Sequence, residues 1–294
     1  MNIPTSALLA LVQSYPIRMQ HLKKIAMLCS DLRDFPNVPT EQLCKVLRLS
    51  PERINIIKKS FIQHMTSALL ESYRHQKIHV IPFTSPHYPQ KLLQLYDPPI
   101  ILFAKGNIKL LTRKYYIASI GSRQATSYSM DALKLILPPL IEQKIVIVSG
   151  LAKGADTISH KLAIQLGGET IAVLGHGLQM IYPKENESIA RILMQEHLLI
   201  TEYPLGVGPQ KYHFPMRNRI ISGMSDALIV TEANVRSGTM ITTEQALEAG
   251  KDVFAVPGPI TSTLSYGTNK LIKEGAIPVM NGYQILEELQ ILRA

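Results

Sequence analysis

Three cations, an aromatic ring and an amide lie close together in the segment Lys211-Tyr-His-Phe214-Pro-Met-Arg217-Asn218-Arg219. Lys and Arg side chains bind phosphates, and a Phe ring offers a face on which a nucleic-acid base can stack. An apolar helical run follows the segment, so its cations should lie near a helix N-terminus, where the helix dipole also favours anions. The pattern predicts a site for a nucleic-acid backbone. A basic helix start that pairs with nearby carboxylates is the alternative.

Polar, glycine-rich turns follow several apolar runs that we interpret as strands. These turns are Gly121-Ser122-Arg123, Ser149-Gly150-Leu-Ala-Lys153-Gly154, Gly175-His176-Gly177, Ser237-Gly238-Thr239 and Pro257-Gly258. Glycines let backbone N–H groups approach an anion closely, and hydroxyl groups add donors. Any one such turn is equally typical of a tight strand-to-helix connection. Because the ends of parallel strands meet at one sheet edge, the set predicts an anion site there, with Arg123 and Lys153 adding charge.

The elements that must position these residues fall into two regions. Residues 1–78 show apolar spacing typical of short helices, with helix starts predicted at a Thr40 cap and at Ser50-Pro51. Beyond them, apolar runs alternate with helical patterns. The predicted strands are 79–83, 100–103, 116–120, 145–148, 170–174, 198–200, 227–230 and 253–256. We therefore predict a small all-α domain over 1–78 and a doubly wound, mostly parallel α/β domain over 79–294.

The amino-acid composition indicates which kind of partner the protein binds. The chain carries a net charge of +9, most of it within the first 78 residues, which favours an anionic partner. No apolar run approaches the ~18 residues that a membrane helix requires, and the N-terminus lacks the basic segment of a signal peptide. We expect no membrane association and a cytoplasmic location. Cys29 and Cys44 are expected to be reduced, and no cofactor or metal site is predicted.

Motifs for catalysis are not found. The sequence contains neither a Walker-type phosphate loop nor a Gly-x-Ser-x-Gly elbow. Asp156 and His160 lie four residues apart on one predicted helix face, and we expect a structural role, with Asp156 stabilising the helix start. Asp226 and Glu232 are expected to hold cations or helix caps. No catalytic residue is therefore predicted.

A series of motifs gives the chain a resemblance to one family. They are Tyr88-Pro89, Asp97-Pro98-Pro99, Lys105-Gly106, Gly121-Ser122-Arg123, Ser149-Gly150 to Asp156, Tyr182-Pro183, Glu202-Tyr203-Pro204, Phe214 to Ile221, Glu232-Ala233, Ser237-Gly238-Thr239 and Val256-Pro257-Gly258. In this order, over about residues 80–285, they are similar to the DNA-processing protein A family (DprA, also called Smf).

The resemblance implies an extended Rossmann-like domain that binds single-stranded DNA, preceded here by a helical domain similar to a sterile-alpha-motif module. It implies loading of the RecA recombinase onto incoming strands during natural transformation, with a homodimer as the working form. Single-stranded DNA-binding protein is a candidate further partner. Many members carry a C-terminal winged-helix domain, which we expect this chain, ending at Ala294, to lack.

The resemblance also carries roles onto particular positions. Arg123, Lys211 and Phe214 match DNA-contacting positions, and Arg217, Asn218 and Arg219 are expected to line the same pocket. The remaining predicted DNA-binding residues, which supply donors and charge, are Gly150, Lys153, Ser237, Gly238 and Thr239.

A hydrolase on a related fold is the alternative function. Nucleoside-monophosphate phosphoribohydrolases resemble this chain in a strand-end Gly-Thr turn, but they place a catalytic Glu three residues after the Thr. Here Thr242 occupies that position, and Glu244 comes two residues later. Two positions along a helix turn a side chain to another face. We therefore expect that the protein is not an enzyme.

Overall fold

The computed structural model describes residues 2–235 and 237–291, so the predicted domain end at 292–294 lies outside it. The N-terminal helices are α1 (Thr5–Ser14), α2 (Met19–Ile25), α3 (Thr40–Leu47), α4 (Pro51–His64) and α5 (Ser67–His75), with the 3-10 helix η1 (Leu32–Asn37). The Ser50 hydroxyl accepts the Arg53 N–H and so caps α4, as predicted. The Thr40 prediction was wrong, because Thr40 is the first residue of α3 and its hydroxyl donates to Asn55.

A nine-stranded sheet forms the centre of the second region, in the order β1-β2-β6-β5-β4-β3-β7-β8-β9. The strands are β1 (His79–Pro82), β2 (Ile101–Gly106), β3 (Tyr116–Ile120), β4 (Val146–Ser149), β5 (Thr170–Leu174), β6 (Leu198–Thr201), β7 (Ala227–Val230), β8 (Asp252–Ala255) and β9 (Ile277–Pro278). All neighbours from β6 to β9 pair in parallel, whereas β2 runs antiparallel to both β1 and β6. The mostly parallel α/β class is confirmed.

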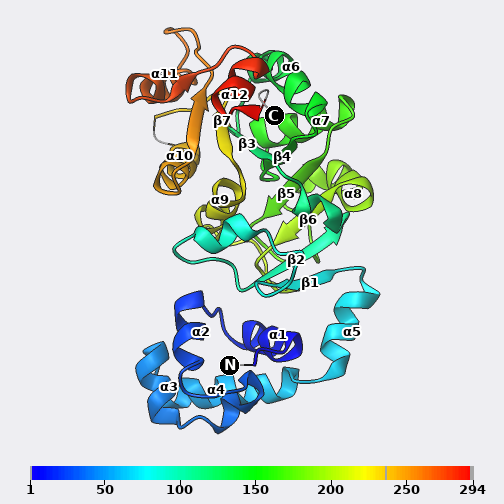
Figure 1. Ribbon diagram of the computed structural model, residues 1–294, viewed down its shortest axis with the longest axis vertical. Helices are drawn as coiled ribbons and strands as arrows, with labels where there is room; N and C mark the ends of the chain where they lie inside the picture. Colours follow the sequence, from blue (N-terminus) through cyan, green and yellow to red (C-terminus); the bar gives the residue numbers. More distant parts are fainter. Residues whose placement is uncertain (1, 236, 292–294) are drawn as a thin grey trace.

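Helices cover both faces of this sheet (Figure 1). They are α6 (Ser127–Glu142), α7 (Ala155–Gln165), α8 (Glu187–Glu196), α9 (His213–Met224), α10 (Gly238–Glu248), α11 (Tyr266–Lys273) and α12 (Gly282–Glu288). The short 3-10 helices are η2 (Gln90–Gln94), η3 (Ile108–Thr112) and η4 (Lys184–Asn186). One apolar core includes α9 and α10 residues such as Ile221 and Ala246. A second contains Leu133 of α6 and Leu162 of α7. Burial on both faces explains why the strands are continuous Ile/Val/Leu runs.

The strand order reverses at β3. From β3 the chain proceeds outward through β4, β5 and β6, and then returns along α9 to place β7 on the other side of β3. In open α/β sheets, the carboxyl ends of the strands beside such a reversal form the ligand crevice. The turns after β3, β4 and β5, which the sequence singled out, therefore lie at one edge.

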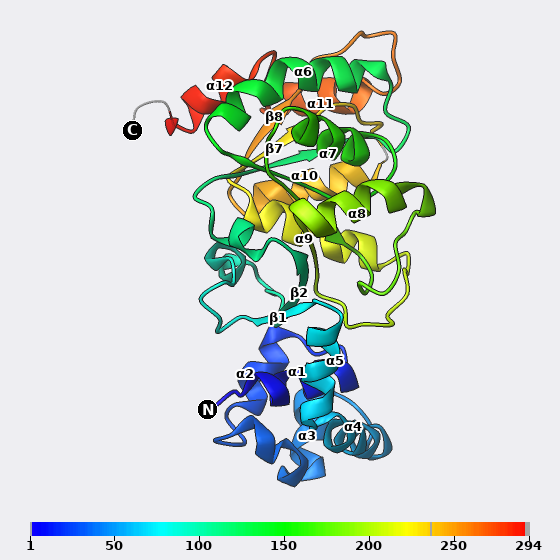
Figure 2. The ribbon, with the colours of Figure 1, turned by 90° about the vertical axis from the view of Figure 1, so that its right-hand side faces the viewer.

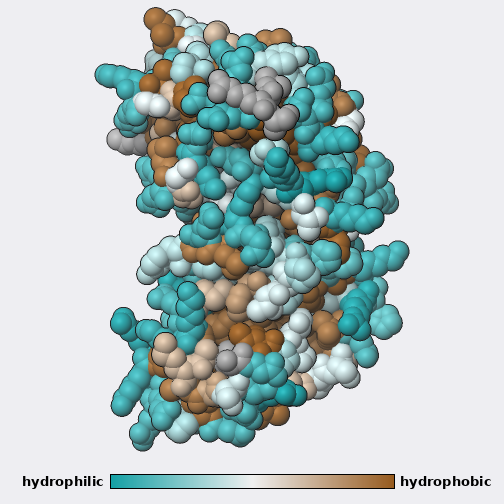
Figure 3. Space-filling view, viewed as in Figure 1, coloured by the Kyte–Doolittle hydropathy of each residue, from teal (hydrophilic) through white to brown (hydrophobic). Residues whose placement is uncertain are grey.

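The helical region packs against the outer strands rather than standing apart. A single apolar core holds Leu8 of α1 and Phe61 of α4 together with Phe103 of β2. The Tyr73 ring stacks on Phe103 at 5.1 Å, and its hydroxyl accepts the Leu205 N–H at 3.1 Å. Figure 2 shows the loop before α9 running beside α5. In the space-filling view of Figure 3 the two parts form one continuous surface. No helix among the described residues is long and apolar enough to cross a membrane.

Candidate nucleic-acid interface

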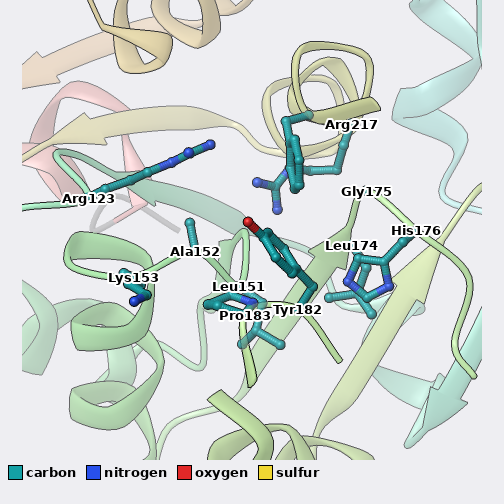
Figure 4. Close-up of a pocket in the computed structure, with 11 residues that line it drawn as sticks. Arg123, Leu151, Ala152, Lys153, Leu174, Gly175, His176, Tyr182, Pro183 and Arg217 are labelled. Atoms are coloured by element: carbon teal, nitrogen blue, oxygen red, sulfur yellow. The ribbon is translucent and has the colours of Figure 1, made fainter. Parts of the chain in front are cut away.

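A cleft opens where β3, β4 and β5 end, and α9 closes one side of it. The space inside it, open solvent included, is about 480 Å³. The lining residues are Arg123, Leu151, Ala152, Lys153, Leu174, Gly175, His176, Tyr182, Pro183, Phe214 and Arg217 (Figure 4). These residues include three cations and no carboxylate, so the cleft presents positive charge.

Two aromatic rings and one guanidinium form the outer part of the cleft. The Phe214 and Tyr182 ring centroids lie 5.9 Å apart, tilted by 40°. The Arg123 guanidinium lies over the Phe214 ring, 5.6 Å from its centroid, in cation–π geometry. Tyr182, which precedes a cis peptide bond to Pro183, is half exposed. Tyr182 is not among the site residues predicted from the sequence, because its distance from the basic segment along the chain gives no sign that it faces Phe214.

Arg217 forms the charged base of the cleft. It is 5% exposed, donates to the Val173 carbonyl, and lies 4.0 Å from the Asp156 carboxylate. Burial lowers the pKa of Arg217 and raises that of Asp156, and each charge opposes the shift of the other. Asp156 also accepts the Ala152 N–H at the start of α7, which is the structural role expected for it. Asn218 accepts from the Arg217 Nε at 3.0 Å and thus orients it from behind.

Gly150 makes room for this guanidinium. A Cβ atom at position 150 would lie 2.1 Å from Arg217 Nη1 and 2.3 Å from an Asp156 oxygen. Real Cβ atoms do not approach other atoms so closely, so only glycine lets the buried pair form. Gly150 therefore supports the cleft from beneath and is not among the lining residues.

Lys153 and Lys211 are both exposed. Lys153 lines the cleft and its Nζ is 2.6 Å from Glu185, in a solvent-exposed pair of the kind that contributes little stability. Lys211 is exposed, lies two residues before the start of α9, and has no ion-pair partner in the described part of the chain. It does not line the cleft itself, but it lies three residues before Phe214.

Arg219 lies away from the cleft. Its Nη2 pairs with Glu202, and both side chains are largely buried. Burial raises the pKa of Glu202, and the Arg219 charge opposes that rise. Arg219 had been expected beside Arg217 in the pocket. The two side chains leave α9 in different directions. Arg217 faces the cleft, whereas Arg219 faces Glu202, which follows β6.

The turn at the start of α10 lies outside the cleft lining as well. The Thr239 hydroxyl donates to the Gly121 carbonyl at 3.0 Å, which ties α10 to the turn after β3. Ser237 Oγ is buried and has no hydrogen-bond partner among the described residues. Gly238 is exposed. These three residues border the β3–β7 reversal and are not among the residues that line the cleft.

The other titratable groups singled out in the sequence have structural partners. Glu232 accepts from the Thr126 N–H and hydroxyl at the start of α6. Asp226 pairs with Lys91 at 2.7 Å. His160 is fully buried between the Gly150 carbonyl and the Thr170 hydroxyl, and burial lowers its pKa to about 4. His160 is therefore neutral at pH 7 and remote from solvent.

Comparison with known proteins identifies the family. The family model described as DNA recombination-mediator protein A matches residues 79–290. The chain belongs to this family. The DNA processing protein DprA of Bacillus subtilis is 44% identical over 221 residues, covering 75% of this chain and 74% of that protein. The DprA of Streptococcus pneumoniae is 46% identical over 203 residues, covering 69% and 71% of the two chains.

Solved structures of the DprA family agree with the fold. The crystal structure of Streptococcus pneumoniae DprA has a TM-score of 0.82 at 36% identity and covers 98% of this chain and 99% of its own. A Helicobacter pylori DprA structure, described for its single-stranded DNA binding mode, has a TM-score of 0.66 at 30% identity, covering 73% and 96%. The chain is thus a DNA-processing protein of the DprA family.

Proposed function

We propose that this protein is a cytoplasmic, single-stranded DNA-binding recombination mediator that loads RecA onto incoming strands in natural transformation, working as a homodimer. The observation that carries the DNA-binding part is the cleft, in which Phe214 and Tyr182 face each other beneath Arg123. Aromatic faces combined with cations are the usual means of binding single strands without sequence preference. The Helicobacter pylori relative, whose structure was determined for its single-stranded DNA binding, supports this proposal.

The chemistry of the cleft favours a single strand over a duplex. A base can stack on Phe214 only when it is free of its pairing partner, and the ring is partly recessed between α9 and the turn after β5. Arg123 lines the cleft and Lys211 is exposed three residues before Phe214, so both are available to contact phosphates. Duplex DNA would present its phosphates to these cations but could not place a base on the ring.

The positions of the α10 residues argue against the hydrolase alternative. The Thr242 hydroxyl is buried and donates to the Gly238 carbonyl at 3.1 Å. Glu244 is exposed on α10 and does not line the cleft. Asp156, the acid beside Arg217 at the base of the cleft, is paired with that guanidinium. We therefore propose a binding protein without hydrolase activity; release of a free base from a nucleoside monophosphate, assayed by chromatography, would contradict this.

The first experiment measures DNA affinity of the full chain. A labelled oligothymidylate and a matched duplex are titrated by fluorescence anisotropy at several salt concentrations. Wild type should prefer the single strand. Arg123→Ala and Lys211→Ala should each reduce the slope of log affinity against log salt by about 0.7, because one phosphate contact is lost. Phe214→Ala should weaken binding by about 1–3 kcal/mol with an unchanged slope.

A matched control separates these effects from loss of net charge. Lys161→Ala removes an exposed cation of α7 that neither lines the cleft nor forms an ion pair in the described part of the chain. It should bind like wild type. Wild-type affinity in the Arg123, Lys211 and Phe214 variants would contradict the site. A RecA-loading assay on DNA coated with single-stranded DNA-binding protein then tests the mediator function, which requires that the Phe214 variant fail.

A further inference from the structure

One exposed aromatic side chain lies just before α9, the helix that closes one side of the cleft. Tyr212 is 68% exposed and lies between Lys211 and the start of α9. Its hydroxyl makes no hydrogen bond among the described residues, and its side chain does not line the cleft. A single exposed aromatic ring is ordinary on a protein surface. Tyr212 differs from an ordinary surface ring in that it packs on the buried His213 ring and lies at the start of α9.

A short row of rings holds Tyr212 in place. The His213 ring packs on Tyr203 at 4.0 Å and lies edge-on to Tyr212 at 4.5 Å, with the planes 75° apart. His213 is 6% exposed and burial lowers its pKa, so it is a neutral, fixed ring at pH 7. Because the contact uses an edge, a face of Tyr212 is left to solvent. The ring is therefore ordered in advance, which lowers the entropy that a stacked ligand would have to overcome.

The spacing from Phe214 suits neighbouring nucleotides. Tyr212 and Phe214 are two residues apart, so their Cα atoms lie within ~7 Å. A stretched single strand can place adjacent bases at such a separation. His213, between them in the chain, is buried, and the exposed Lys211 next to Tyr212 supplies a cation.

We propose that Tyr212 is a second base-stacking site, which takes the nucleotide next to the one stacked on Phe214, with Lys211 on the phosphate between them. This inference rests on the proposed single-stranded DNA binding and extends it from one base to two. The strand then leaves the cleft over the start of α9 toward the loop that Tyr73 of α5 holds through Leu205. Stacking on the ring involves no base-specific hydrogen bonds, so the proposed site accepts any base.

The test uses the full chain and labelled oligothymidylates of increasing length. Tyr212→Ala should weaken binding of the longer oligonucleotides by about 5- to 100-fold, with the salt slope unchanged, because a stacking contact is lost and no charge is removed. Tyr212→Phe keeps the ring and should bind like wild type. Tyr96→Ala removes a tyrosine that is 93% exposed beside η2 and serves as the matched control, with no expected effect.

The length of the oligonucleotide distinguishes stacking on Phe214 from stacking on Tyr212. Oligonucleotides too short to reach both rings should be sensitive to Phe214→Ala and insensitive to Tyr212→Ala. A strand with one abasic position beside the base on Phe214 should bind wild type and Tyr212→Ala equally. If Tyr212→Ala binds every length as wild type does while Phe214→Ala is weakened, the second site is wrong and the cleft stands. If neither variant is weakened, the proposed function itself fails.

Discussion

At the scale of single residues, close packing around the Arg217 guanidinium fixes the position of the positive charge at the base of the cleft. The guanidinium is buried, so it keeps its charge only because the Val173 carbonyl accepts a hydrogen bond from it and the Asp156 carboxylate lies 4.0 Å away. It reaches these partners across the bare backbone of Gly150. A buried, fixed cation at the base of a cleft keeps its position when a ligand arrives, which is what an anion site requires.

Replacing Gly150 tests this arrangement. In Gly150→Ala the added Cβ must displace Arg217 or Asp156, which costs about 1–3 kcal/mol of stability as an overpacked core substitution. Affinity for single-stranded DNA should fall with it, because Arg217 leaves its place. Urea unfolding and anisotropy measure the two effects. Gly208→Ala is the control, since a Cβ at 208 meets nothing within 4 Å and its φ is not positive; unchanged stability and affinity in Gly150→Ala would contradict the account.

At the scale of elements, His160 links α7 to the strands β4 and β5. Its Nε2 is 2.6 Å from the Gly150 carbonyl and its Nδ1 is 2.6 Å from the Thr170 hydroxyl. Burial lowers its pKa to about 4 from the ordinary 6.5. The folded state therefore binds fewer protons than the unfolded state between these values. Its contribution to stability is complete above pH 6.5 and is lost as the pH falls toward 4.

The resulting prediction compares wild type with His160→Gln. Above pH 6.5 the variant should be the less stable, since glutamine fills the site imperfectly. Between pH 6.5 and 4 wild type should lose up to about 3 kcal/mol relative to the variant. Urea unfolding at pH 7.5, 6, 5 and 4.5 measures the difference. The other histidines are present in both proteins and cancel; a difference independent of pH would show that His160 is not buried as a neutral ring.

Sequence patterns predicted most of these elements because their signals are local. Continuous apolar runs gave the eight longer strands, and glycine-rich turns showed where β3, β4 and β5 end. The edge strand β9 was missed because two residues, Ile277 and Pro278, carry no pattern. The opposite orientations of Arg217 and Arg219 could not be predicted, since each depends on a partner distant in sequence, Asp156 and Glu202 respectively.

The whole molecule raises the question of whether its two predicted domains are independent. The boundary at residue 78 follows a change in sequence pattern, and it stays a prediction. One apolar core nevertheless extends from α1 and α4 to β2. Tyr73 lies at the centre of this contact and joins the ring of Phe103 to the loop at Leu205. Because that loop leads to Lys211, the helical region supports one side of the proposed DNA-binding surface.

The last prediction follows from this shared core. Wild type should unfold in urea in a single transition, because neither part can keep its side of the core without the other. Tyr73→Ala should cost about 3–5 kcal/mol, as a large aromatic truncation in a core. Tyr73→Phe should cost about 0.5–1.5 kcal/mol, since the part-buried Leu205 N–H loses its acceptor. Circular dichroism and hydrogen exchange of α5 and β2 follow the two regions separately. Two transitions, with only the helical region shifted by Tyr73→Ala, would mean that the domains fold independently and that the boundary at residue 78 is a true one.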